Sequence, residues 1–402
     1  MDPYITEWVN LILRFAHVIT GIAWIGASFY FVWLDNHLEK PPGWKSDKGI
    51  DGDLWAIHGG GFYEVAKYKH APEKMPELLH WFKWEAYSTW LTGFVLLSLM
   101  FYVGADIYLI DPNIAELSQM QAIAIGLTSI VGGWIVYDVL CRTKLAEHGL
   151  LLGIILMALI TGLSYVLSET FSARGAFMHV GAVIGTIMAG NVFFTIMPSQ
   201  RALVASVEKG EPVDPTWGAK AKLRSTHNTY ATLPLLFIMI SNHYPMIFNH
   251  EYNWLVLMVI FVITAAIRQY FVAKHKGNQN PLVLVGAAAL SIVLAVAIAP
   301  KSATPIIDET GSEVHTVDLQ KVNDIIVSRC ASCHSSTPTD DIFKVAQGGV
   351  ILDDIEQMSR WAPRIQARAV DAKDMPFMNK TKIEDDERNY IALWIAQGAP
   401  VK

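Results

Sequence analysis

Charged residues are scarce in this chain. Asp, Glu, Lys and Arg together make up 17 % of its 402 residues, whereas hydrophobic residues make up 52 %. An ordinary soluble domain carries about 25 % charged residues. The shortage argues against a soluble fold and gives no support to nucleic-acid binding, and the formal net charge of −6 says little because the placement of charge matters more in a membrane protein. The composition predicts a membrane protein.

Cysteine is also scarce, with three residues in the chain. Cys330 and Cys333 are separated by two residues in the sequence CASCH, and Cys141 lies at the end of an apolar run without an obvious partner. This number and spacing do not favour a disulfide framework. A cleavable signal is not expected either, because the N-terminal apolar stretch is too long, carries Arg14 and His17, and lacks a small-residue cleavage site.

Long apolar stretches are what the chain has in abundance. Stretches of about 20 residues, the length that crosses a hydrocarbon core of about 30 Å, occur eight times. They are residues 5–34, 84–105, 121–141, 149–168, 176–197, 230–249, 253–273 and 281–299. The sequence therefore predicts an all-α fold that begins with an eight-helix transmembrane bundle.

Lys and Arg are distributed unevenly among the loops of this bundle. They concentrate in the first, third, fifth and seventh loops, whereas residues 106–120 and 250–252 contain none and residues 169–175 contain only Arg174. Because positive charge near span ends is retained in the cytoplasm, we expect both termini to lie outside. The tail that begins near Pro300 is then periplasmic, and the bundle lies in a bacterial inner membrane.

The CASCH sequence, residues 330–334, has the spacing of a c-type haem attachment site. Cys330 and Cys333 would form the thioethers, and the neutral imidazole of His334 would be the proximal iron ligand. Such attachment is completed outside the cytoplasm in c-type cytochromes, which agrees with the loop charges. A zinc half-site would need further Cys or His ligands, and the tail offers only His315.

Apolar residues at helical spacing predict helices over residues 318–329 and 384–397, before and after this motif. Both resemble the terminal helices of a small class I cytochrome c. The distal methionine of that family corresponds to Met375 in DMPFMN, with Met378 and Met358 as competitors, and His/Met ligation raises the reduction potential. We therefore expect a transmembrane catalytic domain at 1–299, a linker at 300–317 and a periplasmic cytochrome c domain at 318–402.

Polar residues inside the spans are costly and are therefore functional candidates. The first span carries Arg14 and His17 in LRFAHVITGIAWIGASFYF, and the fifth carries His179 in FMHVGAVIGTIMAGNVFF. When His17 is laid on His179, further residues coincide, which suggests two four-span halves related by duplication. The second and sixth spans open on the polar clusters LLHWFKWEAYSTW and RSTHNTYATLP, and the sixth ends on ISNHYP.

These stretches together resemble the membrane-bound, cytochrome c-linked urate oxidases known as the PuuD family. The specific phrases are HVITGIAWIGASFYF, HWFKWEAYSTWLTGF, HNTYATLPLLFIMISNHYP and the tail motif, so the resemblance covers essentially the whole chain. It implies oxidation of urate to 5-hydroxyisourate, with electrons leaving through the haem rather than passing to oxygen to make hydrogen peroxide. A soluble cytochrome c or a terminal oxidase would accept them.

Urate is an electron-rich anion, and its oxidation needs a cationic or amide-lined pocket, a base and a water molecule. We expect the catalytic groups among His80, Lys83, Glu85, His227 and Asn228. Charge, amide groups and aromatic rings for substrate binding would come from Arg14, Trp81, Asn191, Tyr230 and Arg268. Each of these residues has a structural alternative as an interfacial aromatic, a snorkelling lysine, a paired arginine or a capping histidine.

Two other functions stay open from the sequence. The helices could hold b-type haems and oxidise a quinol. A fainter likeness of HVITGIAWIGASF and the region His80–Lys83 to haem-binding proteins of the HemJ and CopD kind points instead to a porphyrinogen oxidase. A periplasmic haem and a cytoplasmic-side pocket would be separated by most of a core about 30 Å thick, so we also hypothesise a haem b held by some of His17, His179 and His243.

Overall fold

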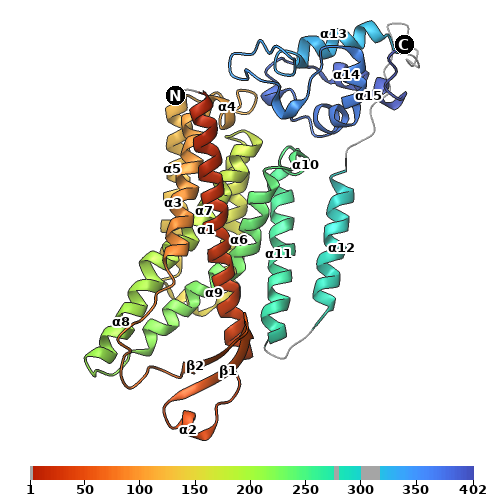
Figure 1. The fold of residues 1–402 in the computed structure, drawn as a ribbon. Coiled ribbons are helices and arrows are strands. Elements are labelled where there is room, and N and C mark those ends of the chain that lie inside the picture. The colour runs from red at the N-terminus through yellow and green to blue at the C-terminus, as the bar shows by residue number, and fades with distance from the viewer. Residues whose placement is uncertain (1–2, 276–279, 300–316) are drawn as a thin grey trace. The chain divides into compact units, whose positions relative to one another are not determined.

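The computed structural model of the chain describes residues 3–275, 280–299 and 317–402 (Figure 1). The chain divides into two compact units, Met1–Ile240 with Leu257–Ile292 and Ser241–Val256 with Val293–Lys402. Helices account for 69 % of the structure, so the chain is mostly helical as predicted. The predicted linker lies outside the described residues except for Val317, and His315 lies outside them as well.

Long helices make up most of the chain. They are α1 (Pro3–His37), α3 (Trp84–Leu97), α5 (Gln119–Leu140), α6 (Gly149–Ser168), α7 (Ala173–Gly190), α8 (Met197–Glu208), α9 (Pro215–Ser241), α11 (Asn253–His275) and α12 (Leu282–Ala297). The π-helical segment η1 (Ser98–Val103) continues α3, and a second one, η3 (Asn191–Ile196), joins α7 to α8. Short helices α4 (Ala105–Tyr108) and η2 (Lys144–Glu147) follow η1 and α5.

Six helices of the described residues are long and apolar enough to cross a membrane. They correspond to the first five predicted spans and the seventh. The eighth predicted span forms α12, which is apolar but only 16 residues long. A multi-pass bundle is thus supported, and the number of eight crossings stays a prediction.

The sixth predicted span has different bounds in the structure. The prediction was residues 230–249, but α9 begins at Pro215 and ends at Ser241, and the short α10 (Pro245–Phe248) follows after a turn. A proline lacks the backbone N–H that would continue the helix and disfavours helical geometry in the residue before it. Pro245 therefore separates the two helices, and the polar RSTHNTYATLP stretch lies inside α9.

Helices α5 and α7 pack closely because glycine residues face the partner helix. A Cβ atom added at Gly126 of α5 would lie 2.7 Å from Nε2 of His179, which is fully buried on α7. One added at Gly133 would lie 2.6 Å from Cγ1 of Val183. Side chains larger than glycine would push the two helices apart at these points.

A β-hairpin between α1 and α3 is the exception to the all-α prediction. Strand β1 (Ile50–His58) pairs antiparallel with β2 (Gly61–Tyr68), after a short helix α2 (Gly43–Ser46). The connecting residues Gly59 and Gly60 have φ angles of +56° and +82°, the left-handed conformations that a tight two-residue hairpin turn requires. The sequence signal was HGGGF between two alternating segments, and the prediction missed it.

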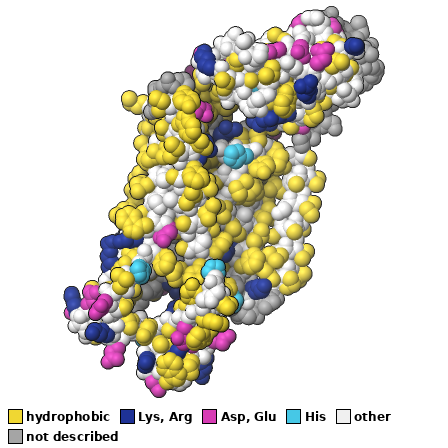
Figure 2. Space-filling view, in the orientation of Figure 1, with side chains coloured by type: hydrophobic (Ala, Val, Ile, Leu, Met, Phe, Trp, Pro, Cys, Tyr) yellow, Lys and Arg dark blue, Asp and Glu magenta, His cyan; other side chains and the backbone are white. Residues whose placement is uncertain are grey.

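The surface of the first unit agrees with a membrane environment. On the face seen in Figure 2, hydrophobic side chains cover much of the long helices, while charged side chains gather at the end that holds the hairpin and α8. Large apolar side chains on α1 and α6 are half or more exposed, among them Phe15, Ile22, Leu150 and Ile154. In water such a surface would be costly, so it is compatible with lipid surroundings.

The tail has a hydrophobic core of its own. It contains α13 (Leu319–Cys330), η4 (Gln347–Gly349), α14 (Ile355–Ile365), η5 (Gln366–Asp371), η6 (Phe377–Asn379) and α15 (Asp385–Ala396). The two predicted tail helices are therefore confirmed within one or two residues. Ile326, Met358, Ile391 and Trp394 are fully buried in this core, and each such side chain contributes about 1.5–3 kcal/mol to stability.

Candidate functional site

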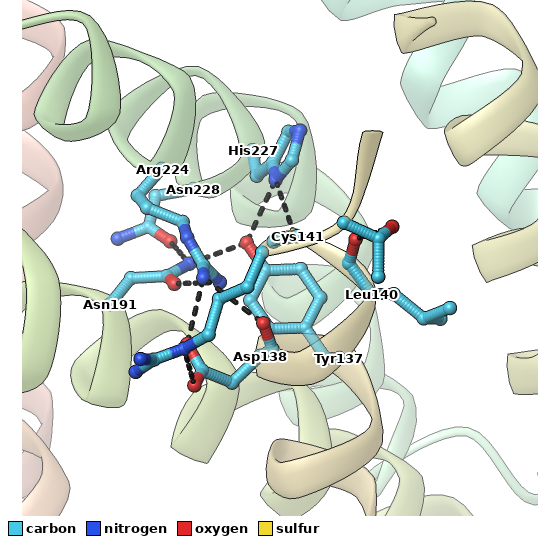
Figure 3. Close-up of polar contacts among 10 residues, drawn as sticks. Tyr137, Asp138, Leu140, Cys141, Asn191, Arg224, His227 and Asn228 are labelled. Carbon is cyan, nitrogen blue, oxygen red and sulfur yellow. Dashed lines mark hydrogen bonds and ion pairs between the residues drawn. The ribbon is translucent and has the colours of Figure 1, made fainter. Parts of the chain in front are cut away.

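A buried ion pair joins α5 to α9 at one end of the bundle (Figure 3). Nη2 of Arg224 lies 2.7 Å from Oδ1 of Asp138, and the two residues are only 4 % and 7 % exposed. Nε of the exposed Arg142 lies 2.6 Å from the other carboxylate oxygen of Asp138. Buried charges are rarely left unpaired, and this pair links the C-terminal turn of α5 to the N-terminal half of α9.

An amide and a phenol extend the ion pair into a network. Nη1 of Arg224 donates to Oδ1 of Asn191 (3.3 Å), and Nδ2 of Asn191 donates to both the hydroxyl of Tyr137 and Oδ1 of Asn228 (2.9 Å each). Nδ2 of Asn228 donates to the carbonyl of Met188 (3.0 Å). Asn191 opens the π-helical segment η3 and is 1 % exposed. Both amide atoms of Asn191 are thus used inside the bundle.

His227 lies at the end of this network. Its Nδ1 is 2.8 Å from the hydroxyl of Tyr137 and 3.9 Å from Sγ of Cys141, and the ring is partly buried. The guanidinium of Arg224 lies 5.0 Å from the centroid of the Tyr137 ring. Among the described residues Nε2 of His227 has no hydrogen-bond partner. The network therefore orients the imidazole through one nitrogen and leaves the other available.

Three of the ten predicted catalytic and substrate-binding residues meet in this network, namely Asn191, His227 and Asn228. The prediction missed Tyr137, Asp138 and Arg224. Two sequence signals could have found them: Tyr137 and Asp138 end the apolar run VGGWIVYDVLCR, and Arg224 opens RSTHNTYATLP.

The predicted residues around the start of α3 lie elsewhere. Lys83 is the N-terminal flanking residue of α3, with Nζ 5.7 Å from the centroid of the Trp84 ring, and Glu85 is in its first turn. Trp81 packs against a cluster that includes Val192, the residue after Asn191. No hydrogen bond among the described residues links His80, Lys83 or Glu85 to the network.

The remaining predicted substrate-binding residues lie on other helices. Nε of Arg14 donates to Oδ1 of Asn10 on the same helix (2.6 Å). Tyr230 lies on α9, where its hydroxyl donates to Oε1 of Gln269. Arg268 lies on α11, is 7 % exposed and stacks on the ring of Phe29 of α1.

The histidines proposed for a haem b have these surroundings. Nδ1 of His179 donates to the carbonyl of Gly175 (2.8 Å), and its Nε2 lies 3.2 Å from the hydroxyl of Tyr102. Nδ1 of His17 donates to the carbonyl of Thr89 (3.1 Å). His243 is exposed. Both ring nitrogens of His179 are engaged, so this arrangement does not suit iron binding by His179, and the second haem stays a hypothesis.

The CASCH turn brings the proposed haem-attachment residues together. Cys330 ends α13, and its carbonyl accepts hydrogen bonds from the backbone N–H groups of Cys333 (3.2 Å) and His334 (3.0 Å). Both cysteines are free thiols. Nδ1 of His334 donates to the carbonyl of Val350 (3.3 Å), which directs the acceptor nitrogen Nε2 away from the backbone. This donor set fits a c-type haem, because the imidazole is oriented through the nitrogen that would not bind iron.

Met375 lies on a loop that is fixed through its backbone. Its N–H donates to the carbonyl of Arg368 (3.2 Å), and its carbonyl accepts from Nη1 of Arg388 (2.7 Å). Met375 and Met378 are partly buried, whereas Met358 is fully buried among the core side chains of the tail. Met375 is thus more accessible than Met358, in keeping with its proposed role as the distal ligand.

These features define a class of protein: a helical bundle compatible with several membrane crossings, with a buried polar network at one end. The family model described as Urate oxidase N-terminal matches residues 3–299, and the chain therefore belongs to this family. Membership supports an oxidoreductase that acts on urate. No curated protein and no solved structure matches the chain.

Proposed function

We propose that the chain is a membrane-bound urate oxidase that converts urate to 5-hydroxyisourate and passes the electrons to a c-type haem on its tail. The observation that carries this proposal is the buried network ending at His227, which lies within the region matched by the family model. Urate and one water give 5-hydroxyisourate, two protons and two electrons. The reaction makes no hydrogen peroxide, because the electrons do not go to oxygen.

His227 is the proposed acceptor of a proton from urate or from the attacking water. In the tautomer with a proton on Nδ1, that nitrogen donates to the oxygen of Tyr137 and Nε2 is the free base. When Nε2 takes up a proton, the ring becomes an imidazolium, and its Nδ1–H still points at the oxygen of Tyr137. The ion pair of Asp138 and Arg224 keeps Asn191 in place, and Asn191 keeps Tyr137 in place.

Cys330, Cys333, His334 and Met375 are the residues that would hold the haem. A haem held there would supply one-electron transfer, through which the electrons from urate would reach a soluble cytochrome c or a terminal oxidase. The proposed location is the bacterial inner membrane, with both termini and the cytochrome domain (318–402) in the periplasm.

The competing functions are a quinol-oxidising electron-transfer module and a porphyrinogen oxidase. Membership of the urate oxidase family favours urate over both substrates.

The test uses oxidised membranes that contain the full chain. Urate, a quinol and a porphyrinogen are added separately, and the α-band of the c-type haem is recorded. We expect urate alone to reduce the haem. Reduction by a quinol or a porphyrinogen but not by urate would overturn the proposal.

A further inference from the structure

Arg268 is a buried cation, two of whose nitrogens lack hydrogen-bond partners in the described part of the chain. It lies on α11, is 7 % exposed, and neither Nε nor Nη2 has a hydrogen-bond partner among the described residues. Most buried arginines are paired, as Arg224 is with Asp138. An unpaired charge inside a membrane bundle is costly and marks a functional site by default.

The surroundings of Arg268 are aromatic. Its guanidinium carbon lies 4.8 Å from the centroid of the Phe29 ring on α1, and Phe29 is itself 37 % exposed. Phe29 therefore covers one side of the guanidinium and borders the outside of the bundle. A planar guanidinium beside an aromatic ring suits a flat ligand that stacks on the ring and accepts two parallel N–H groups.

Helix α9 connects Arg268 to the polar network. Tyr230 of α9 interacts with Gln269, the residue next to Arg268, by a hydrogen bond. Residues three apart on a helix are neighbours about 5–6 Å apart between their Cβ atoms, so His227 is one turn from Tyr230 on the same helix. A ligand anchored on Arg268 beside Tyr230 would thus approach the free Nε2 of His227.

We propose that Arg268 binds a planar organic anion. The Phe29 ring, which lies against the guanidinium, would stack on this ligand. This inference rests on the proposed function and deepens it, because urate is a planar anion. A phospholipid phosphate would also be an anion. However, Arg268 is enclosed by protein side chains even without lipid, which favours a small ligand that enters the bundle.

The experiment measures binding without turnover. Thermal unfolding of the purified full-length protein is followed with urate, with orotate as a planar anion, with uracil as the neutral ring of orotate, and with phosphatidylglycerol. We expect urate and orotate to raise the unfolding temperature and uracil and phosphatidylglycerol to leave it unchanged. Stabilisation by phosphatidylglycerol alone would overturn the proposal.

Variants of Arg268 distinguish a role in anion binding from a purely structural role. Arg268→Met should raise the unfolding temperature of the ligand-free protein, because it removes an unpaired buried charge, and should abolish the shift caused by urate and orotate. Arg268→Gln should raise the KM for urate about 30-fold or more, with a smaller change in kcat. Arg201→Gln, which removes an exposed arginine of α8, is the matched control and should behave as the wild type.

The outcomes distinguish this inference from the proposed function. One outcome is that urate reduces the haem while Arg268→Gln keeps the wild-type KM and Arg268→Met lowers the unfolding temperature. In that case Arg268 does not bind the anion, and the proposed urate oxidase function is still supported. If urate never reduces the haem, but orotate stabilises the wild type and does not stabilise Arg268→Met, then Arg268 binds a planar anion and the proposed urate oxidase function is wrong.

Discussion

Single side chains carry the chemistry of the proposed site. Asp138, Arg224, Asn191 and Tyr137 are joined by hydrogen bonds, and this chain of bonds ends on Nδ1 of His227. A base that is fixed through one nitrogen and free at the other can exchange a proton without first reorienting. His227 is therefore the residue whose loss should affect catalysis most.

His227→Gln keeps a side chain that can hydrogen-bond Tyr137 but removes the base. We expect kcat for urate to fall about 10²–10⁴-fold, with KM and haem content little changed, because general-base catalysis is worth that much. Steady-state rates with a soluble cytochrome c check this. His148→Gln, an exposed histidine after η2, is the control. A His227→Gln variant with wild-type kcat would remove His227 from the mechanism.

Asp340 gives the tail a dependence on pH. Burial raises the pKa of Asp340, but the hydrogen bond from Lys380 and those from the N–H groups of Phe343 and Ile342 outweigh it and hold the pKa well below its usual range. A lowered folded-state pKa adds stability above the unfolded-state value of about 3.9, and this stability is lost as the pH falls through the folded-state value. Unfolding of the tail measured between about pH 5 and about pH 2 should show the loss, and Asp340→Asn should reduce it. An unchanged pH profile in Asp340→Asn would contradict this account.

The sequence allowed only part of the site to be predicted. Asn191, His227 and Asn228 were found because polar residues within or beside apolar spans are conspicuous. Asp138 and Arg224 were missed because they are 86 residues apart, and their pairing depends on how two helices pack rather than on spacing along the chain. The contact of the Arg268 guanidinium with the Phe29 ring likewise depends on packing between two helices, α11 and α1.

Secondary-structure elements set where these side chains lie. The positions of the six long apolar helices could be predicted from apolar length, and the tail helices from helical periodicity. The hairpin and the end of α9 could not be predicted from apolar length, because both depend on local turn chemistry at Gly59, Gly60 and Pro245. Close packing of α5 on α7 then brings Tyr137 within reach of Asn191.

The contact of α5 with α7 can be tested at two glycines of the same helix. A Cβ added at Gly126 would collide with His179, whereas nothing lies within 4 Å of one added at Gly132. Gly126→Ala should therefore destabilise the protein by about 1–3 kcal/mol, because overpacking is costly. Gly132→Ala should be neutral or stabilise by up to about 1 kcal/mol through helix propensity. Equal effects of the two changes on the unfolding temperature would show that α5 does not pack as described.

At the scale of the whole molecule, we propose a division of work between the helical bundle and the tail. Among the described residues, the hydrophobic core of the tail is built from residues 317–399, with Ile326, Ile391 and Trp394 at its centre. The urate oxidase family model ends at residue 299, before this core begins. We therefore propose that the bundle oxidises urate and that the tail transfers electrons.

Residues 300–402, exported and matured with haem, should form a soluble red protein that does not oxidise urate. The self-contained core makes independent folding the expected result. Absorption spectra, size-exclusion chromatography and a urate assay check the three parts of this prediction. Urate turnover by the fragment would move catalysis out of the membrane part.

The most direct test of the central claim is the electron balance of urate oxidation. The purified full-length protein is mixed with urate and an excess of oxidised soluble cytochrome c without oxygen, and urate, reduced cytochrome c and hydrogen peroxide are measured together. We expect two molecules of cytochrome c to be reduced per urate consumed, no peroxide to form, and the reaction to be lost in Cys330→Ala/Cys333→Ala. Urate oxidation that needs oxygen and yields one peroxide per urate, unaffected by the loss of both cysteines, would contradict it.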